Sequence, residues 1–142
     1  MENMELVLNA VSVYQAQTEQ VGKIWDYFSV VSLTVVGIIL KSDKAVRTMK
    51  EPLVIIGAYL IFCINNHLAL LKYHEQLNQL GSLVATLKIE AGAKLTAFGV
   101  QDLRWIQQSH ILFIIAVCAG SLLTAWIRIK KNAKKSVPHA SN

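Results

Sequence analysis

Three apolar runs constrain this chain more than any other feature. They cover about residues 24–40, 52–72 and 108–128, and each is close to the roughly 20 residues that an α-helix needs to cross a bilayer. Of the 142 residues, 54% are hydrophobic and only 16% are charged, whereas soluble domains carry about 25% charged residues. We therefore predict an all-α membrane protein with three transmembrane helices, and we expect residues 1–142 to form a single membrane domain.

The second apolar run does not stop at the expected membrane boundary. Leu77, Leu80, Val84 and Leu87 continue its pattern at three- and four-residue steps, which predicts one helix from Pro52 to about Glu90. The sequence AGAKLTAFG should break this helix, and another should begin near Gln101 or Asp102. Residues 73–107 would then form an extended helical hairpin, made by the second and third spans and projecting outside the membrane.

The N-terminal segment predicts a separate, short amphipathic helix from Met4 to Thr18. Leu6, Val7, Ala10, Val11 and Tyr14 recur there at helical spacing. Its glutamates favour packing on protein over contact with anionic lipid. Within the first span, Ser32 and Thr34 are expected to return their hydroxyls to the helix backbone.

Aromatic and basic residues flank the spans in a pattern typical of membrane proteins. Four aromatic residues are expected to anchor the helices at the lipid interface, namely Trp25, Tyr27, Trp105 and Trp126. Cations gather in the loop 41–51 and in the basic inner tail 128–142, where they are Lys41, Lys44, Arg47, Lys50, Arg128, Lys130 and Lys131, followed by Lys134 and Lys135.

These two basic clusters lie on the same side of the membrane if the chain crosses it three times. Because cytoplasmic loops carry the excess of Lys and Arg, we predict an N-terminus outside and a C-terminus in the cytoplasm, in a bacterial inner (plasma) membrane. The net charge of +5 is then a topology signal. No nucleic-acid partner is expected, because the tail has no aromatic side chain on which bases could stack.

Asn65, Asn66 and His67 stand in the outer half of the second span. Polar side chains are costly in hydrocarbon unless they find partners, and three consecutive residues cannot share one helix face. We interpret them as helix-packing groups and therefore expect neighbouring helices from an oligomer or a larger partner. Two alternatives remain: a polar lining of a pore or cavity, and a metal or haem site formed by His67 and His110. We predict no cofactor.

The third span carries small residues at four-residue spacing, Ala116, Gly120 and Thr124. Such a stripe lets two helix backbones approach closely. The contact could lie within one chain, most simply with the second span, or between subunits. Cys63 and Cys118 are predicted to be free thiols, because two cysteines inside apolar runs do not make a disulfide framework.

No phosphate-binding GxxxxGK, metalloprotease HExxH, nucleophile GxSxG or redox CxxC motif occurs, so no enzyme activity is expected.

We predict a small integral membrane protein that assembles as a homo-oligomer or as an accessory or scaffold subunit, with itself or another membrane protein as partner in the lipid bilayer. The alternative is a pore-forming protein. In topology alone, three spans, an outer N-terminus and a basic inner tail resemble phage holins; the resemblance covers architecture and no motif.

Overall fold

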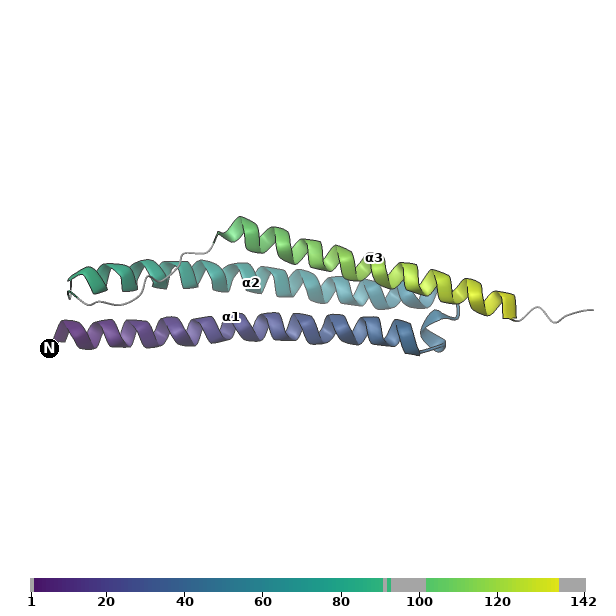
Figure 1. Ribbon diagram of the computed structural model, residues 1–142, viewed down its shortest axis with the longest axis horizontal. Helices are drawn as coiled ribbons and strands as arrows, with labels where there is room; N and C mark the ends of the chain where they lie inside the picture. The colour runs from purple at the N-terminus through teal and green to yellow at the C-terminus, as the bar shows by residue number, and fades with distance from the viewer. Residues whose placement is uncertain (1, 91, 93–101, 136–142) are drawn as a thin grey trace, which may run out of the picture. The chain divides into compact units, whose positions relative to one another are not determined.

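The computed structural model describes residues 2–90, 92 and 102–135, and every regular element within them is helical. The elements are α1 (Glu2–Lys41), the short 3₁₀ helix η1 (Lys44–Val46), α2 (Lys50–Glu90) and α3 (Leu103–Lys135) (Figure 1). Three of these helices contain stretches long and apolar enough to cross a membrane, Met4–Lys41, Lys50–Ile89 and Leu103–Lys134. This confirms the predicted all-α class.

The predicted short N-terminal helix is wrong as a separate element. α1 runs without interruption from Glu2 to Lys41 and joins the segment 4–18 to the first span. Nothing between the two stops a helix: residues 18–23 contain no proline, and Gly22 weakens a helix by only about 1 kcal/mol. The buried face is also continuous, because Val7, Val21 and Phe28 are spaced by multiples of seven.

The predicted extent of the second helix is confirmed, since α2 ends at Glu90. Just beyond it, Gly92 adopts a φ of 62° and its N–H donates to the carbonyl of Ile89 at 3.1 Å. A left-handed glycine of this kind is a common end to a helix, and it lies where the sequence predicted the break. The rest of the predicted connection, 93–101, lies outside the described residues.

The start of α2 has a reciprocal cap that the sequence analysis missed. The backbone N–H and the hydroxyl of Thr48 donate to Oε2 of Glu51 at 2.9 and 2.5 Å, and the Thr48 hydroxyl accepts from the N–H of Lys50. The spacing Thr-x-x-Glu is the capping-box signature, so the signal was present in the sequence. The hydrogen bonds from Thr48 hold the pKa of the exposed Glu51 carboxyl below its usual value.

The chain divides into two compact units, each built from parts of all three long helices. Unit 1 comprises Met1–Tyr27 and Asn65–His110. Its core joins Val21 of α1, Leu70 and Leu77 of α2 and Ile106 of α3, and Tyr14, Ile24, Trp25 and Tyr73 pack against them. The prediction of a single membrane domain remains a prediction.

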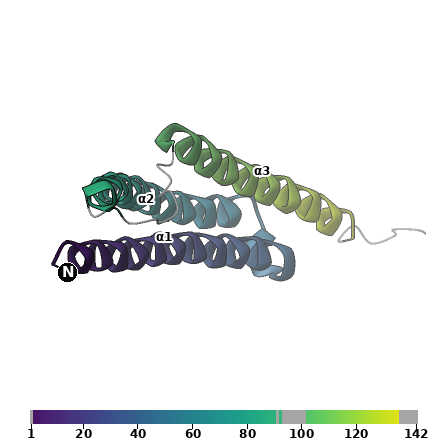
Figure 2. The ribbon, with the colours of Figure 1, turned by 60° about the vertical axis from the view of Figure 1, so that its left-hand side comes forward.

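Unit 2 comprises Phe28–Ile64 and Ile111–Asn142. It contains the turn between α1 and α2, which Figure 2 shows from a second direction. Ser32 donates its hydroxyl to the carbonyl of Phe28 at 2.7 Å, and Thr34 donates to Val30 at 2.8 Å, as predicted. Because the Ser32 proton is used in this way, the Tyr59 hydroxyl, 2.8 Å away, donates to Ser32 and links α1 to α2.

Most of the apolar surface of these helices is not covered by the chain itself. In the most apolar 18 residues of the three helices, only 22%, 22% and 17% of the residues are buried. Large side chains such as Leu33, Val54 and Leu112 are about 70% exposed. A water-soluble helix hides one apolar stripe and shows polar residues elsewhere, whereas these helices are apolar on their outer faces.

Gly81 offers a direct test of the packing in unit 1. A Cβ at this position would lie 3.3 Å from the ring of Tyr14, whereas a Cβ at Gly22 would meet nothing within 4 Å. We expect Gly81→Leu to destabilise the protein by about 1–3 kcal/mol through overpacking and Gly22→Leu to be close to neutral. Reversible unfolding in detergent micelles measures both; equal effects would contradict the contact between α1 and α2.

Candidate functional site

A cluster of polar side chains lies in unit 1, where α2 and α3 bring Asn66, His67 and His110 together. Nδ1 of His67 and Nδ1 of His110 are 3.1 Å apart, and the rings stack at 24° with centroids 5.1 Å apart. The amide nitrogen of Asn66 lies 3.3 Å from Nε2 of His110. His110 is fully buried, and the ring of Trp25 on α1 meets it edge to face at 5.3 Å.

These contacts form a consistent chain of hydrogen bonds between neutral groups. With the Asn66 amide nitrogen as donor, Nε2 of His110 accepts, so the proton of His110 is on Nδ1. That N–H donates to Nδ1 of His67, and the remaining proton of His67 is on its Nε2. Neither ring needs a positive charge, which is what an apolar environment favours.

The structure therefore separates the three consecutive polar residues of α2. Asn66 and His67 find a partner within the same unit, whereas the side chain of Asn65 lies on an exposed face. Asn66 and His67 therefore need no neighbour from outside the chain, because both pair with His110.

The paired histidines do not fit a haem site. Two axial ligands of one haem lie on opposite faces of the porphyrin. Stacked rings with centroids 5.1 Å apart, joined through their Nδ1 atoms at 3.1 Å, leave no space for it between them. Within residues 2–90, 92 and 102–135, no three His, Cys, Asp or Glu side chains come together as metal ligands. Cys63 and Cys118 are free.

His74 is a polar group that the sequence analysis did not single out. It is 3% exposed, and neither ring nitrogen has a hydrogen-bond partner among the described residues. It lines a cavity of about 560 Å³ in unit 1, together with Trp25, Trp105 and Ser109. The spacing of residues in the sequence gave no sign that His74 is buried, because the burial of one imidazole depends on which helices lie next to it.

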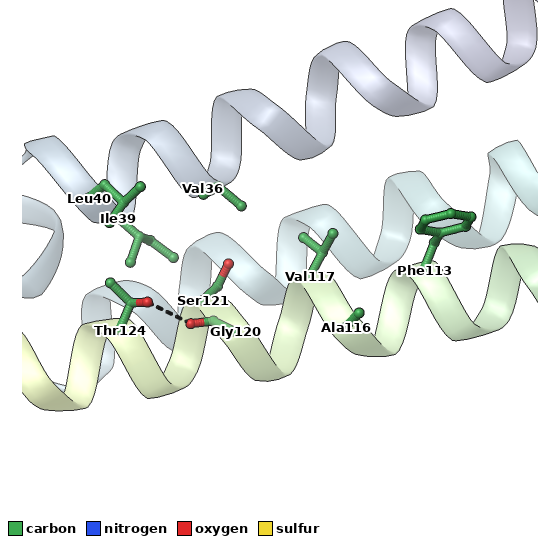
Figure 3. A pocket seen from close by; sticks show the side chains of 9 residues that line it. All are labelled: Val36, Ile39, Leu40, Phe113, Ala116, Val117, Gly120, Ser121 and Thr124. Carbon is green, nitrogen blue, oxygen red and sulfur yellow. Dashed lines mark hydrogen bonds between the residues drawn. The ribbon is translucent and has the colours of Figure 1, made fainter.

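An open groove of about 360 Å³ lies in unit 2 (Figure 3). The predicted stripe of small residues runs along its α3 wall, and Val36, Ile39 and Leu40 of α1 form the other wall. Ala116 and Gly120 are exposed. A Cβ at Gly120 would meet nothing within 4 Å, so no helix of unit 2 approaches the stripe closely.

Ser121 lies beside this stripe and was missed by the sequence analysis. The residue is 3% exposed, yet its hydroxyl has no hydrogen-bond partner among the described residues. Figure 3 shows the hydroxyl rising from α3 into the space between α3 and α1. The neighbouring Thr124 instead donates to the carbonyl of Gly120 at 2.7 Å.

The predicted basic flank separates into two kinds of residue. Six of its cations are exposed, namely Lys41, Lys44, Arg47, Lys50, Lys130 and Lys131. Arg128 is partly buried and donates to the carbonyl of Ile39 at 2.5 Å and to Oδ1 of Asp43 at 2.6 Å. It therefore caps the C-terminal end of α1, where a cation is favoured.

The predicted interfacial aromatic residues also differ from one another. Tyr27, Trp105 and Trp126 are exposed, whereas Trp25 is half-buried against the core of unit 1. The Nζ of Lys130 lies 3.8 Å from the centre of the Trp126 ring, a cation–π contact. Three of the four are thus free to face a headgroup layer, and Trp25 has a packing role as well.

The chain matches no protein-family model, no curated protein and no solved structure. Its function is therefore inferred from its own residues.

The histidine pair can be tested by a double-mutant cycle. His67→Leu and His110→Leu should each destabilise the protein, because each leaves a buried polar partner unpaired. The double variant should lose less than the sum, with a coupling energy of about 0.6–1.7 kcal/mol. Unfolding free energies in detergent give the cycle, and strictly additive losses would contradict the hydrogen bond.

The capping role of Arg128 can be tested by comparing it with an exposed cation of the tail. We expect Arg128→Met to destabilise the protein by about 1–3 kcal/mol, because it removes charged hydrogen bonds to the end of α1. Lys131→Met removes the same charge from an exposed position and should change stability by less than about 0.5 kcal/mol. Thermal unfolding of both variants in one detergent compares them, and equal shifts would exclude the capping role.

Proposed function

We propose that this chain is a non-enzymatic integral membrane protein that assembles, as a homo-oligomer or as an accessory subunit of a larger membrane complex. The observation that carries the proposal is the exposed apolar surface of all three long helices. Exposing a large apolar side chain to water costs about 1.5–3 kcal/mol relative to burying it. Side chains such as Ile61, Leu112 and Phe113 are 57–68% exposed, so the helices need lipid or other helices around them.

The polar side chains of the helices also support assembly, because several of them join one helix to another. Within unit 1, Asn66, His67 and His110 are used to join α2 to α3. In unit 2, Arg128 joins α3 to the end of α1. The groove with the small residues of α3 remains as a surface for another helix.

The proposed orientation has the N-terminus outside and the basic tail in the cytoplasm of a bacterial inner membrane. It is supported by the exposed cations Lys44 and Arg47 between α1 and α2, by Lys50 at the start of α2, and by Lys130 and Lys131 near the end of α3. In this orientation the hairpin 73–107 projects outside. A pore is the competing function, and a haem subunit is disfavoured by the geometry of the histidine pair.

Orientation and assembly can be measured on one set of proteins. In a variant with Cys63→Ala and Cys118→Ala, a cysteine placed at Asn9 should react with an impermeant thiol reagent from outside intact cells, and a cysteine at Ser136 should not. Labelling at position 136 from outside would overturn the proposed orientation.

Assembly is tested by native mass spectrometry of the wild-type protein extracted in detergent, with the expectation of a homo-oligomer or a complex with a second membrane protein. A monomer without partners would contradict the proposal. Rapid loss of membrane potential on expression of the chain alone would favour the pore.

A further inference from the structure

We infer that the groove of unit 2 is the docking surface for a second copy of this chain, with α3 of one copy lying beside α3 of the other. This inference rests on the proposed function and names its partner. The groove is the one lined by Ala116, Gly120 and Thr124 on α3 and by Val36, Ile39 and Leu40 on α1 (Figure 3).

The small size of Gly120 has no use within unit 2. A glycine in a helix costs about 1 kcal/mol relative to alanine, and such a cost is usually offset by a close approach of another backbone. At Gly120, as at Gly37 and Gly57 of the same unit, a Cβ would meet nothing within 4 Å, but of these three glycines Gly120 is the one that lines the groove. Ala116, one turn earlier, is also exposed. A helix from outside the unit could therefore approach α3 along this stripe at the short distance that small residues allow.

Ser121 indicates that the occupant carries a polar group. Its side chain is 3% exposed and its hydroxyl has no partner among the described residues. Leaving a buried hydroxyl unpaired costs about 1–3 kcal/mol. A lipid acyl chain could fill the groove but could not pair with this hydroxyl, whereas a protein helix with a hydroxyl or amide could. The occupant is therefore a helix.

A second copy of the chain supplies such a helix in its own α3, which carries the same small residues and the same serine hydroxyl. Every residue that lines the groove is uncharged, so two identical faces can meet without repulsion. Arg128 lies one turn after Thr124, but its charge is directed to Asp43 and the end of α1. Copies in the same membrane share one orientation, so their α3 helices are parallel, and a two-fold axis along the membrane normal would place Ser121 of each copy near the other.

The test compares two glycines of unit 2 that both lack a neighbour within 4 Å, Gly120 on α3 and Gly57 on α2. Single-molecule photobleaching of the labelled protein in liposomes gives the monomer–dimer equilibrium. We expect wild type and Gly57→Leu to form dimers with the same affinity. Gly120→Leu should weaken the dimer at least tenfold, because the leucine fills the groove. Circular dichroism should show the same helix content in all three proteins, since a Cβ at either position meets nothing within 4 Å.

A second variant distinguishes a helix from a lipid chain in the groove. Ser121→Ala should weaken the dimer several-fold, because the hydrogen bond between copies is lost. If an acyl chain were the occupant, removing the hydroxyl would leave the affinity unchanged or raise it.

The remaining outcomes separate the inference about the groove from the proposed function. If Gly120→Leu dimerises as wild type does, another surface holds the copies together, and the inference is wrong while the proposed function stands. The same holds if a different membrane protein co-purifies with wild type but is lost from Gly120→Leu. If wild type is monomeric in liposomes and no protein co-purifies with it from cells, both the inference and the proposed function fail.

Discussion

Hydrogen bonding of polar side chains inside an apolar bundle is the constraint on which the arrangement of helices in each unit depends. In hydrocarbon an α-helix makes all its backbone hydrogen bonds within itself. Few polar groups are then left that could hold one helix in a fixed position against another. Among the described residues, such bonds between two helices include Tyr59 with Ser32, Asn66 and His67 with His110, Arg128 with the end of α1, and the exposed pair Gln17 and Gln76. Apolar contacts fill the space between these points, and they tolerate a shift of one helix along its axis. A hydrogen bond does not tolerate such a shift.

The buried residues of α1 and of α2 recur at steps of seven. In α2 they include Ile56, Cys63, Leu70, Leu77 and Val84. This repeat places one narrow seam of α1 and one of α2 against their neighbours. In the proposed membrane protein lipid covers the other faces, so a narrow seam is enough for helices of 40 and 41 residues that bury only a small share of their apolar residues.

The length and class of the helices could be predicted from the sequence, because apolar runs and three- to four-residue steps are local properties. The end of α2 at Glu90 and the break at Gly92 followed from the same signals. The prediction of a separate helix over residues 4–18 was wrong, because the same helix continues to Lys41 and no proline interrupts it. The capping box of Thr48 and Glu51 was readable and was overlooked.

The pairings between helices could not be predicted in this way. Arg128 belongs to the basic flank from which the orientation was predicted, and nothing local in the sequence shows that it reaches a carbonyl 89 positions earlier in the chain. His67 and His110 were predicted together only as an alternative metal or haem pair, and the sequence could not give their 3.1 Å contact or the role of Asn66. The burial of His74 likewise depends on neighbours supplied by α1 and α3.

The hydroxyls of the helices show how the chain treats polar groups at packed faces. A serine or threonine in a helix can donate to the carbonyl four residues earlier, and Ser32, Thr34 and Thr124 all do so. Ser32 also accepts from Tyr59 of α2, so one hydroxyl serves its own helix and a neighbour at once. Ser121 is buried as Ser32 is, yet makes neither bond. Among the described serines of unit 2, the position that lacks a partner is therefore the one facing the groove, where the neighbour would come from another chain.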